Sequence, residues 1–459
     1  MILGGCARFH PKPVNAEATA ADFDRRSLLD PGLKKFIETA TQTAVEPWPP
    51  VSWDLTDLTL AAFYYHPSLD LARAEWASAQ ARGITAGERA NPSLLVAPGY
   101  NTTRSVPSPW LPLAALDIPL ETAGKRGHRM ARAAQLSEAA RLNIASVAWQ
   151  VRSRLRNSLA ALDAARQSQE LLAEQQAYHA ENLQLLQRQY EAGAISAFEL
   201  TQARIASDAA AFALSDAQRQ SAEALVQVAD ALGLPAQALS GVDLSPAELD
   251  RLPVESALAE ARRQALSNRS DILGSLAEYA ASQSALQLEI ARQYPDIHLI
   301  PGYQYDQGED KWSLGIGVTL PMLNRNKGGI AEASAAREEA AARFVLLQSG
   351  VIASIDSAVA GYRGALLARS EAETSLARQQ EQEKTAAAML DAGEISRGEL
   401  LALRLQLSAS ALTRLSAIVK VREALGKLED ALQSPLGLPA AAWQMAPRTA
   451  ENGDTKEHP

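Results

Sequence analysis

Apolar side chains recur at steps of three and four residues over two unusually long stretches of the chain, both free of proline. The first stretch runs from near Lys125 to Tyr190 and the second from near Lys327 to Leu390. Apolar residues at this spacing line one face of an α-helix. They are Ile144, Val147, Val151, Leu155, Leu159 and Leu162, and then Ile352, Ile355, Val359, Tyr362 and Leu366. At 1.5 Å per residue, about 65 residues predict a helix of roughly 100 Å, longer than an ordinary globular helix.

A second helix is predicted to return after each long one. In the first case its seam consists mainly of small residues at heptad spacing: Leu200, Ala203, Ser207, Ala210, Leu214, Ala217, Ser221, Ala224 and Val228. Alternating steps of three and four predict a left-handed supercoil. The connection contains Gly, then Ser three residues later, then Glu after three more, at 193–199 and again at 393–399. Gly ends a helix by adopting positive φ, and Ser-x-x-Glu is a capping box.

A period of two residues replaces the helical period at 312–320. There, small or polar residues alternate with Trp312, Leu314, Ile316, Val318 and Leu320. This pattern predicts a strand with one fully apolar face. Ile297 and Leu299 predict a partner strand, and 306–310 the turn. Two strands of about ten residues suit a membrane-spanning hairpin. In the first half, strands are predicted within about 92–120, although prolines interrupt that segment.

Landmarks recur in the same order about 200 residues apart, which predicts an internal duplication. Gly193 is matched by Gly393, Pro119 by Pro321, and the Leu-Gly-Leu-Pro run at 232–235 by the run at 436–439. We therefore expect two repeats, 55–240 and 241–439, each opening with a helix, roughly from Pro67 to Ala90 and from Pro253 to Gln293. The first would hold strands at about 92–120 and long helices at about 124–232. The second would hold strands at about 295–321 and long helices at about 326–433. Residues 1–54 are interpreted as a leader and lipid-anchor segment, and 440–459 as a disordered tail.

Composition excludes several classes of function. The net charge is −9, so no excess of basic residues is available to neutralise the phosphates of a nucleic acid. The six histidines are scattered singly and there is one cysteine, so we expect no metal site and no cofactor. Because no convergent Ser/His/Asp set is visible, we expect no enzyme. The sequence contains no run of eighteen apolar residues, so no transmembrane helix is predicted. A membrane crossing would therefore need a β-barrel.

The single cysteine, Cys6, follows Leu3-Gly4-Gly5. An apolar residue and two small residues before a Cys resemble a bacterial lipoprotein cleavage site. In this interpretation Cys6 carries the lipid anchor. The alternative is a cysteine without a role near the terminus.

The predicted order of elements, a helix, a hairpin and two long helices, occurs twice along the chain. This order resembles the TolC-type outer-membrane factors of the outer membrane efflux protein family. The resemblance covers nearly all of residues 55–440. The turns Ala-Gly-x-Ile-Ser followed by Glu-Leu, at 192–200 and 392–400, are similar to those of the family. The run Ile-Pro-Leu-Glu-Thr-Ala-Gly-Lys-Arg at 118–126 is similar to the signature of the branch that serves heavy-metal (cobalt–zinc–cadmium) efflux.

The resemblance implies a mainly α fold with a β-barrel part. A homotrimer would share a 12-stranded transmembrane β-barrel, and its helices would form a long coiled-coil α-barrel. The chain would be the outer-membrane channel of a tripartite efflux system in a Gram-negative cell, extending into the periplasm. Its partners would be outer-membrane lipid, a periplasmic adaptor (membrane fusion) protein and an inner-membrane pump of the resistance-nodulation-division type. It would carry solutes, among them heavy-metal cations, as a passive duct.

The resemblance also implies roles for the connections between the helices. The adaptor-docking tips would be Gly193, Ile195, Ser196, Gly393, Ile395 and Ser396. The periplasmic entrance would be gated by Glu199, Arg204, Glu399 and Arg404, although Ala402 stands where family members often carry another acid. The alternative function is a soluble periplasmic coiled-coil scaffold without a membrane span. The apolar strand face at 312–320 favours the duct, because a scaffold has no use for it.

Overall fold

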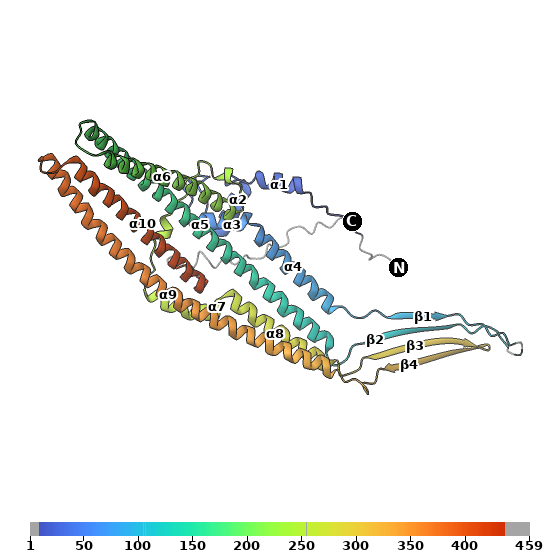
Figure 1. The fold of residues 1–459 in the computed structure, drawn as a ribbon. Helices are drawn as coiled ribbons and strands as arrows, with labels where there is room; N and C mark the ends of the chain where they lie inside the picture. The colour runs from blue at the N-terminus through green and yellow to red at the C-terminus, as the bar shows by residue number, and fades with distance from the viewer. Residues whose placement is uncertain (1–8, 104, 106, 254, 437–459) are drawn as a thin grey trace. The chain divides into compact units, whose positions relative to one another are not determined.

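The computed structural model describes residues 9–103, 105, 107–253 and 255–436 (Figure 1). Cys6 and the predicted tail at 440–459 lie outside these residues. The chain divides into two compact units. Unit 1 comprises Met1–Leu69, Ala148–Ala265 and Ser354–Pro459, and unit 2 comprises Asp70–Val147 and Leu266–Ala353.

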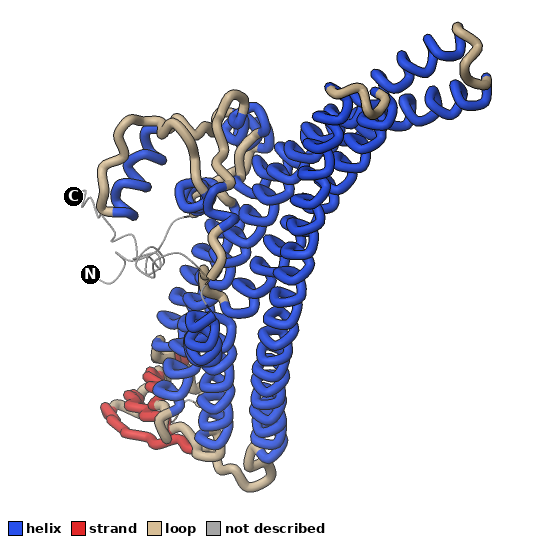
Figure 2. The backbone as a smooth tube through the Cα atoms, turned by 90° about the vertical axis from the view of Figure 1, so that its left-hand side faces the viewer, coloured by secondary structure: helices blue, strands red, loops and turns tan. Residues whose placement is uncertain are grey.

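Unit 2 contains a four-stranded antiparallel sheet with the strand order β1-β2-β3-β4, drawn in red in Figure 2. The strands are β1 (Ser93–Ala97), β2 (Leu113–Leu120), β3 (Ile297–Asp306) and β4 (Glu309–Val318). Each strand of the first hairpin is shorter than its counterpart in the second. Proline explains this, because it cannot donate to a strand ladder and residues 98–112 contain four prolines.

The β3–β4 hairpin closes through a two-residue turn. Its central residues, Gln307 and Gly308, have φ of 52° and 94°. Positive φ at both positions matches a type I′ turn, whose twist suits the flanking strands. The turn fixes the register, which pairs Tyr303 with Trp312 and Ile297 with Val318. Alternate residues of each strand therefore share a face.

The helices of unit 2 are most of α4 (Pro67–Gly87), α8 (Ser270–Ala291) and the first parts of α5 (Lys125–Glu191) and α9 (Lys327–Asp391). Chain reversals precede the two long helices. Ala123 and Gly124 have positive φ before α5, and Asn326 has positive φ before α9. Both long helices begin at the predicted lysine.

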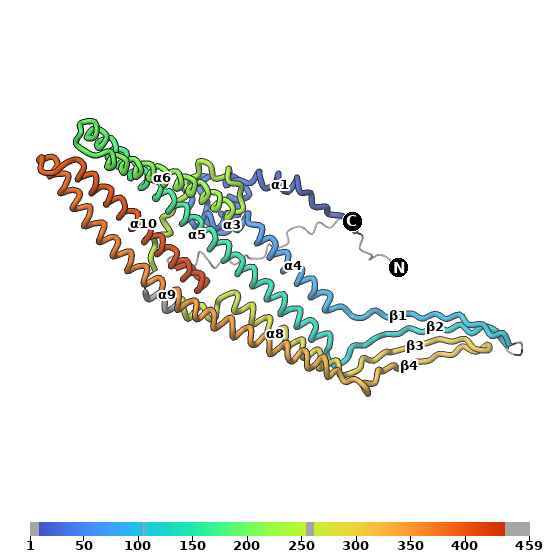
Figure 3. Tube along the Cα trace, viewed as in Figure 1, coloured from blue at the N-terminus to red at the C-terminus, as the bar shows by residue number. Residues whose placement is uncertain are grey.

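Unit 1 contains the tip ends of the long helices and their return helices, α6 (Ala197–Leu232) and α10 (Arg397–Leu432) (Figure 3). The predicted seam of α6 is largely buried. Its alanines at 203, 210, 217 and 224 are at most 8% exposed. Ser207, Leu214 and Ser221 are half-buried.

Residues 1–54, interpreted from sequence as a leader segment, contribute two helices to unit 1. They are α1 (Ala16–Asp24) and α2 (Pro31–Thr41), and Leu28, Leu33 and Ile37 between and within them are at most 1% exposed. Arg26 donates to the carbonyl oxygens of Tyr65 and Gly233, both at 2.9 Å. These bonds join the ends of α3 (Leu55–Tyr65) and α6. The sequence signal for these two helices is a short run of apolar residues at helical spacing. It was overlooked because the segment was interpreted as a leader from its position near the N-terminus.

The helix predicted from Pro253 to Gln293 is instead two helices, α7 (Glu255–Asn268) and α8. Arg269 interrupts them with extended backbone, at φ −59° and ψ 132°. Its guanidinium bonds the carboxylate of Asp271 at 3.0 and 2.6 Å. Two short 3₁₀ helices, η1 (Ala236–Leu239) and η2 (Ala247–Asp250), precede this pair.

Among the described residues, α9 is the one helix that is long and apolar enough to cross a membrane by length and composition. The sequence predicted no transmembrane helix, because that prediction considered only uninterrupted apolar runs. In α9 the apolar residues are interspersed with Gly and Ser. The fold is therefore mainly helical with a small sheet, whereas the duplication and the 12-stranded barrel remain predictions.

Candidate functional site

The two helix tips of unit 1 are tight glycine turns with exposed backbone. Gly193 and Gly393 have φ of +71° and +75°, a conformation that disfavours any residue with a Cβ. The next residues carry the predicted docking side chains. Ile195 and Ile395 are half-buried, whereas Ser196 and Ser396 are exposed.

Both tips contain the predicted capping box. Ser196 Oγ accepts a hydrogen bond from the Glu199 amide at 3.2 Å, and Glu199 Oε2 accepts from the Ser196 amide at 2.7 Å. Ser396 and Glu399 repeat both bonds at the same distances. The backbone hydrogen bond from Ser196 or Ser396 lowers the pKa of each glutamate. Each carboxylate is therefore ionised at neutral pH and holds its own turn closed.

Arg404, a predicted gate residue, is held by a neighbour that the sequence did not indicate. Its Nε donates to Glu383 Oε1 at 2.9 Å, which links α10 to α9. The guanidinium also lies over the Tyr178 ring, 6.0 Å from its centroid. The Tyr178 hydroxyl donates to Glu174 at 2.5 Å, and this bond raises the pKa of Tyr178 to about 12.

A second contact links α5 to the start of α10. Arg397 Nε donates to Glu181 Oε1 at 2.6 Å. By contrast, Arg204 is exposed and has no ion-pair partner among residues 9–436 that the structure describes. The four predicted gate residues are therefore not brought together within one chain. Glu383 and Glu181 were missed because acids recur along both helices without a distinguishing spacing.

One face of the sheet in unit 2 is apolar and exposed. Its β1 and β4 residues are between 43% and 80% exposed: Leu94, Val96, Trp312, Leu314, Ile316 and Val318. Leu320, predicted to belong to the same strand, lies just beyond the end of β4 and is 68% exposed. No segment of unit 2 that the structure describes covers these side chains. The two outer strands, β1 and β4, each leave one edge without a partner strand in the described chain.

The opposite face of the sheet is mixed: by register it carries Leu95, Leu113 and Ile300 together with small and polar residues. On β4 the small and polar residues are Ser313, Gly315 and Gly317. On the central strands, His298 Nδ1 lies 2.8 Å from Asp117 Oδ1.

The predicted signature at 118–126 forms a corner between the sheet and α5. Lys125 Nζ donates to the Tyr294 carbonyl at 2.7 Å and to Asp296 Oδ1 at 2.8 Å. The Thr122 amide donates to the same oxygen at 2.9 Å. Lys125 is only 8% exposed, so its charge needs this carboxylate. The motif thus has a structural role within unit 2.

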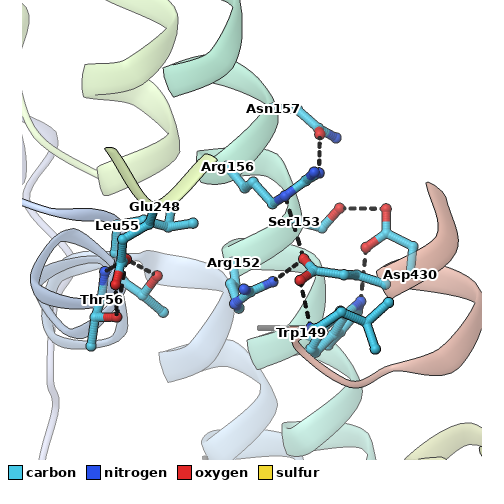
Figure 4. Close-up of polar contacts among 12 residues, drawn as sticks. Leu55, Thr56, Trp149, Arg152, Ser153, Arg156, Asn157, Glu248 and Asp430 are labelled. Atoms are coloured by element: carbon cyan, nitrogen blue, oxygen red, sulfur yellow. Dashed lines mark hydrogen bonds and ion pairs between the residues drawn. The ribbon is translucent and has the colours of Figure 1, made fainter. Parts of the chain in front are cut away.

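A buried polar cluster in unit 1 went unpredicted (Figure 4). Arg152 Nη1 and Arg156 Nε lie 3.0 and 3.3 Å from the same oxygen of Glu429, and all three residues are at most 4% exposed. Burial lowers the pKa of Arg156. The Arg156 Nη2 donates to the Arg422 carbonyl at 2.6 Å.

The cluster extends to both sides. Asp430 accepts from Trp149 Nε1 at 2.9 Å and from Ser153 Oγ at 2.7 Å. Arg422 binds both oxygens of Asp250 in η2 at 2.9 and 3.0 Å. The one sequence feature that could have indicated this cluster is the spacing of Arg152 and Arg156, which places both on one helix face. Their acid partner lies 277 positions from Arg152, so spacing alone could not reveal it.

Among the described residues, no group of three or more His, Cys, Asp or Glu is placed to hold a metal ion.

One family model matches part of the chain. Residues 62–234 match the family model described as "Outer membrane efflux protein". The cobalt-zinc-cadmium resistance protein CzcC of Cupriavidus metallidurans is 27% identical over 253 residues, which are 52% of this chain and 58% of that protein. The chain thus aligns with somewhat over half the length of this relative.

Solved structures share the fold. VceC, an outer membrane protein of Vibrio cholerae, superposes with a TM-score of 0.68 at 17% identity, covering 83% of this chain and 96% of that one. A membrane protein of Pseudomonas aeruginosa superposes with a TM-score of 0.67 at 19% identity, covering 82% of this chain and 92% of that one.

Proposed function

Because the chain carries an outer membrane efflux protein domain, we propose that it is the outer-membrane channel of a tripartite efflux system. In this function it is a passive duct without enzymatic activity or cofactor. It receives solutes from an inner-membrane pump of the resistance-nodulation-division type and a periplasmic adaptor, and releases them outside a Gram-negative cell.

The observation that carries the proposal is the exposed apolar face of the sheet. A patch of large side chains such as Trp312, Leu314 and Ile316, all at least 67% exposed, is unfavourable in water. Outer-membrane strands alternate in this way, with apolar side chains toward lipid and polar ones toward the interior. The soluble scaffold, our alternative, leaves this face unexplained.

The open edges of β1 and β4 support a shared barrel. Unpaired strand edges are not tolerated in lipid, because every backbone polar group needs a partner there. Four strands are too few to close a barrel alone. We therefore propose a homotrimer in which the sheets of three chains join edge to edge as a 12-stranded barrel. The long helices would form the periplasmic α-barrel, and the two halves of the chain would descend from one duplicated unit.

The remaining assignments follow the same function. Gly193, Ile195, Ser196 and their second-half equivalents would meet the adaptor at the exposed tips. Glu199, Arg204, Glu399 and Arg404 would gate the entrance through contacts between copies, since one chain does not join them. Cys6 would carry a lipid anchor. Heavy-metal cations are the proposed cargo, in keeping with the 27% identical cobalt-zinc-cadmium resistance relative.

Detergent extraction followed by mass measurement tests the proposal. We expect the chain to leave cell envelopes only with detergent, and to run as a trimer in detergent solution. Low-resolution images should show a particle with a short barrel at one end. Full recovery in the soluble fraction, or a monomer that needs no detergent, would overturn the duct and favour the scaffold.

A further inference from the structure

We propose that Met322 and Leu323 form an apolar finger that inserts among the anionic phospholipids of the inner leaflet of the outer membrane. The inference rests on the proposed function, because it names the lipid surface that the helix end of the sheet meets. Both residues belong to unit 2 and lie in the connection between β4 and α9, at 319–326.

The finger has no cover within the described chain. Met322 is 78% exposed and Leu323 is fully exposed, at 104%. Leu320, just before the finger, is 68% exposed and continues the apolar alternation of β4. Adjacent apolar side chains of this size are stabilised when they leave water for an apolar phase. The finger therefore extends the apolar face of the sheet toward the helices.

The backbone holds the finger in place from both sides. The Met322 amide donates to the Leu320 carbonyl at 2.8 Å, which closes a three-residue turn around Pro321. On the other side, the Asn326 side-chain amide donates to the Glu289 carbonyl and to Glu289 Oε2, both at 2.8 Å. A connection fixed at both ends loses little conformational freedom when it binds.

The corresponding corner of the first half is built differently. At the offset that relates Pro119 to Pro321, Glu121 stands where the second half has Leu323. Glu121 Oε2 accepts from Arg129 Nη2 of α5 at 2.9 Å, and its side chain is only 24% exposed. A corner of this kind can thus be closed by a contact within the chain. The second half instead places an uncovered apolar side chain there.

The sheet places the finger at the inner boundary of the membrane. Leu320 lies eight positions after Trp312, which is roughly 27 Å along a strand and comparable with the apolar band of about 25 Å in outer-membrane strands. Trp312 lies against Tyr303, with ring centroids 4.9 Å apart, and such aromatic residues mark one membrane interface. The finger follows at the other interface, where headgroups meet acyl chains.

The charges beside the finger select the lipid. Arg325 and Lys327 are both exposed and follow Leu323 within four residues. Membrane attachment strengthens with the apolar area that is buried and with the attraction of basic residues to anionic lipid. An apolar tip next to two cations therefore matches a leaflet in which anionic phosphates lie beside acyl chains.

Quenching by brominated lipid tests the contact at single positions. The full chain, with its single cysteine removed by Cys6→Ser, receives one cysteine by Leu323→Cys, Ile316→Cys or Leu346→Cys, and each carries the same small fluorophore. The proteins are reconstituted in bilayers of phosphatidylethanolamine and phosphatidylglycerol, with or without bromine on the acyl chains.

Two of the three positions are references. Ile316 reports the apolar face of the sheet. Leu346 is the matched leucine, because it is 72% exposed and also belongs to unit 2. It lies on α9, roughly 28 Å along the helix from its first residue, and so beyond the reach of the lipid.

We expect bromination to lower the fluorescence at positions 316 and 323 and to leave it unchanged at 346. Replacing phosphatidylglycerol with phosphatidylcholine should reduce the quenching at 323 but not at 316. Arg325→Gln should weaken this dependence on lipid charge. Quenching at 323 that is indifferent to lipid charge would overturn the choice of anionic phospholipid.

The references separate failure of the finger from failure of the proposed function. Quenching at 316 without quenching at 323 sinks the finger alone, and blue-shifted emission at 323 would then assign it to a contact with a second copy. Equal quenching at 323 and 346 also sinks the finger, because the contact would not be selective. Absence of quenching at both 316 and 323 sinks the membrane-spanning sheet as well.

Discussion

Gly426 lies directly against the guanidinium of Arg156, so that a Cβ at this position would come within 1.8 Å of Nη1. Arg156 has no room to retreat, because Glu429 and the Arg422 carbonyl hold its two ends. Gly426→Ala should therefore lower the free energy of unfolding by about 1–3 kcal/mol, the usual cost of overpacking. Thermal and denaturant unfolding would measure the loss.

Gly361 provides the matched control, since a Cβ there would meet nothing within 4 Å. Gly361→Ala should stabilise helix α9 by roughly 0.5–1 kcal/mol. If both substitutions changed stability equally, the approach of Arg156 would not be what requires glycine at 426.

Glu429 neutralises two buried arginines, Arg152 and Arg156. Glu429→Gln should cost about 3–5 kcal/mol, because it leaves buried cations without a counter-charge. Glu223→Ala removes a partner of the exposed Arg219 and should cost about 0–1 kcal/mol. Comparable losses in the two variants would show that the cluster is better solvated than its burial indicates.

Asp57 should make stability depend on pH. Burial first, and then the charges of Asp54 and Glu248, raise its pKa from 3.8 to about 6. The folded state binds the Asp57 proton more tightly than the unfolded state does. Protonated Asp57 therefore stabilises the folded state fully below pH 3.8, and this contribution is lost as pH rises through about 6. Asp57→Asn should therefore raise the midpoint of thermal unfolding at pH 7.5, by about 1–3 °C. The difference should shrink toward pH 4; a gain independent of pH would contradict the assignment.

The two faces of β4 should respond differently to charge. Ile316→Lys on the apolar face should cost about 2–4 kcal/mol of membrane-inserted stability if the residue lies near the bilayer midplane. Ser313→Lys places the same charge on the opposite face and should cost much less. Heat-modifiable migration of the folded protein in lipid would compare them. Equal tolerance of both lysines would argue against a lipid-facing sheet.

The serine caps should govern local opening at the tips. Ser196→Ala removes the Oγ acceptor of the Glu199 amide and should cost about 1 kcal/mol. Amide exchange at 197–200 should then speed up about fivefold if it occurs by local opening, since 1 kcal/mol is a factor of about five. Ser215→Ala, an exposed position within α6, should leave this rate unchanged.

Periodicity and capping chemistry made much of this fold predictable. The long helices start at the lysines expected, because proline-free apolar spacing and a preceding reversal are local signals. The capping boxes at Ser196 and Ser396 are confirmed for the same reason. The break at Arg269 was missed, because no Pro or Gly marks it and a side-chain bond to Asp271 supplies the interruption.

The candidate sites were less predictable, because they depend on residues far apart in the chain. Arg404 was singled out, but its partner Glu383 is one acid among several on α9. His298 was set aside as an isolated histidine. Its pairing with Asp117 depends on the register of two strands that lie 181 positions apart.

The separation of Arg152 from Glu429 also constrains biogenesis. A chain made from its N-terminus presents both buried arginines long before the acid that neutralises them, which lies 277 positions after Arg152. Until then, desolvating these cations is too costly for the surrounding core to close. The core around these arginines must therefore stay open to solvent until residue 429 has been made. A product truncated before Glu429 would be unable to bury its arginines, which gives quality-control proteases a means of recognising unfinished chains.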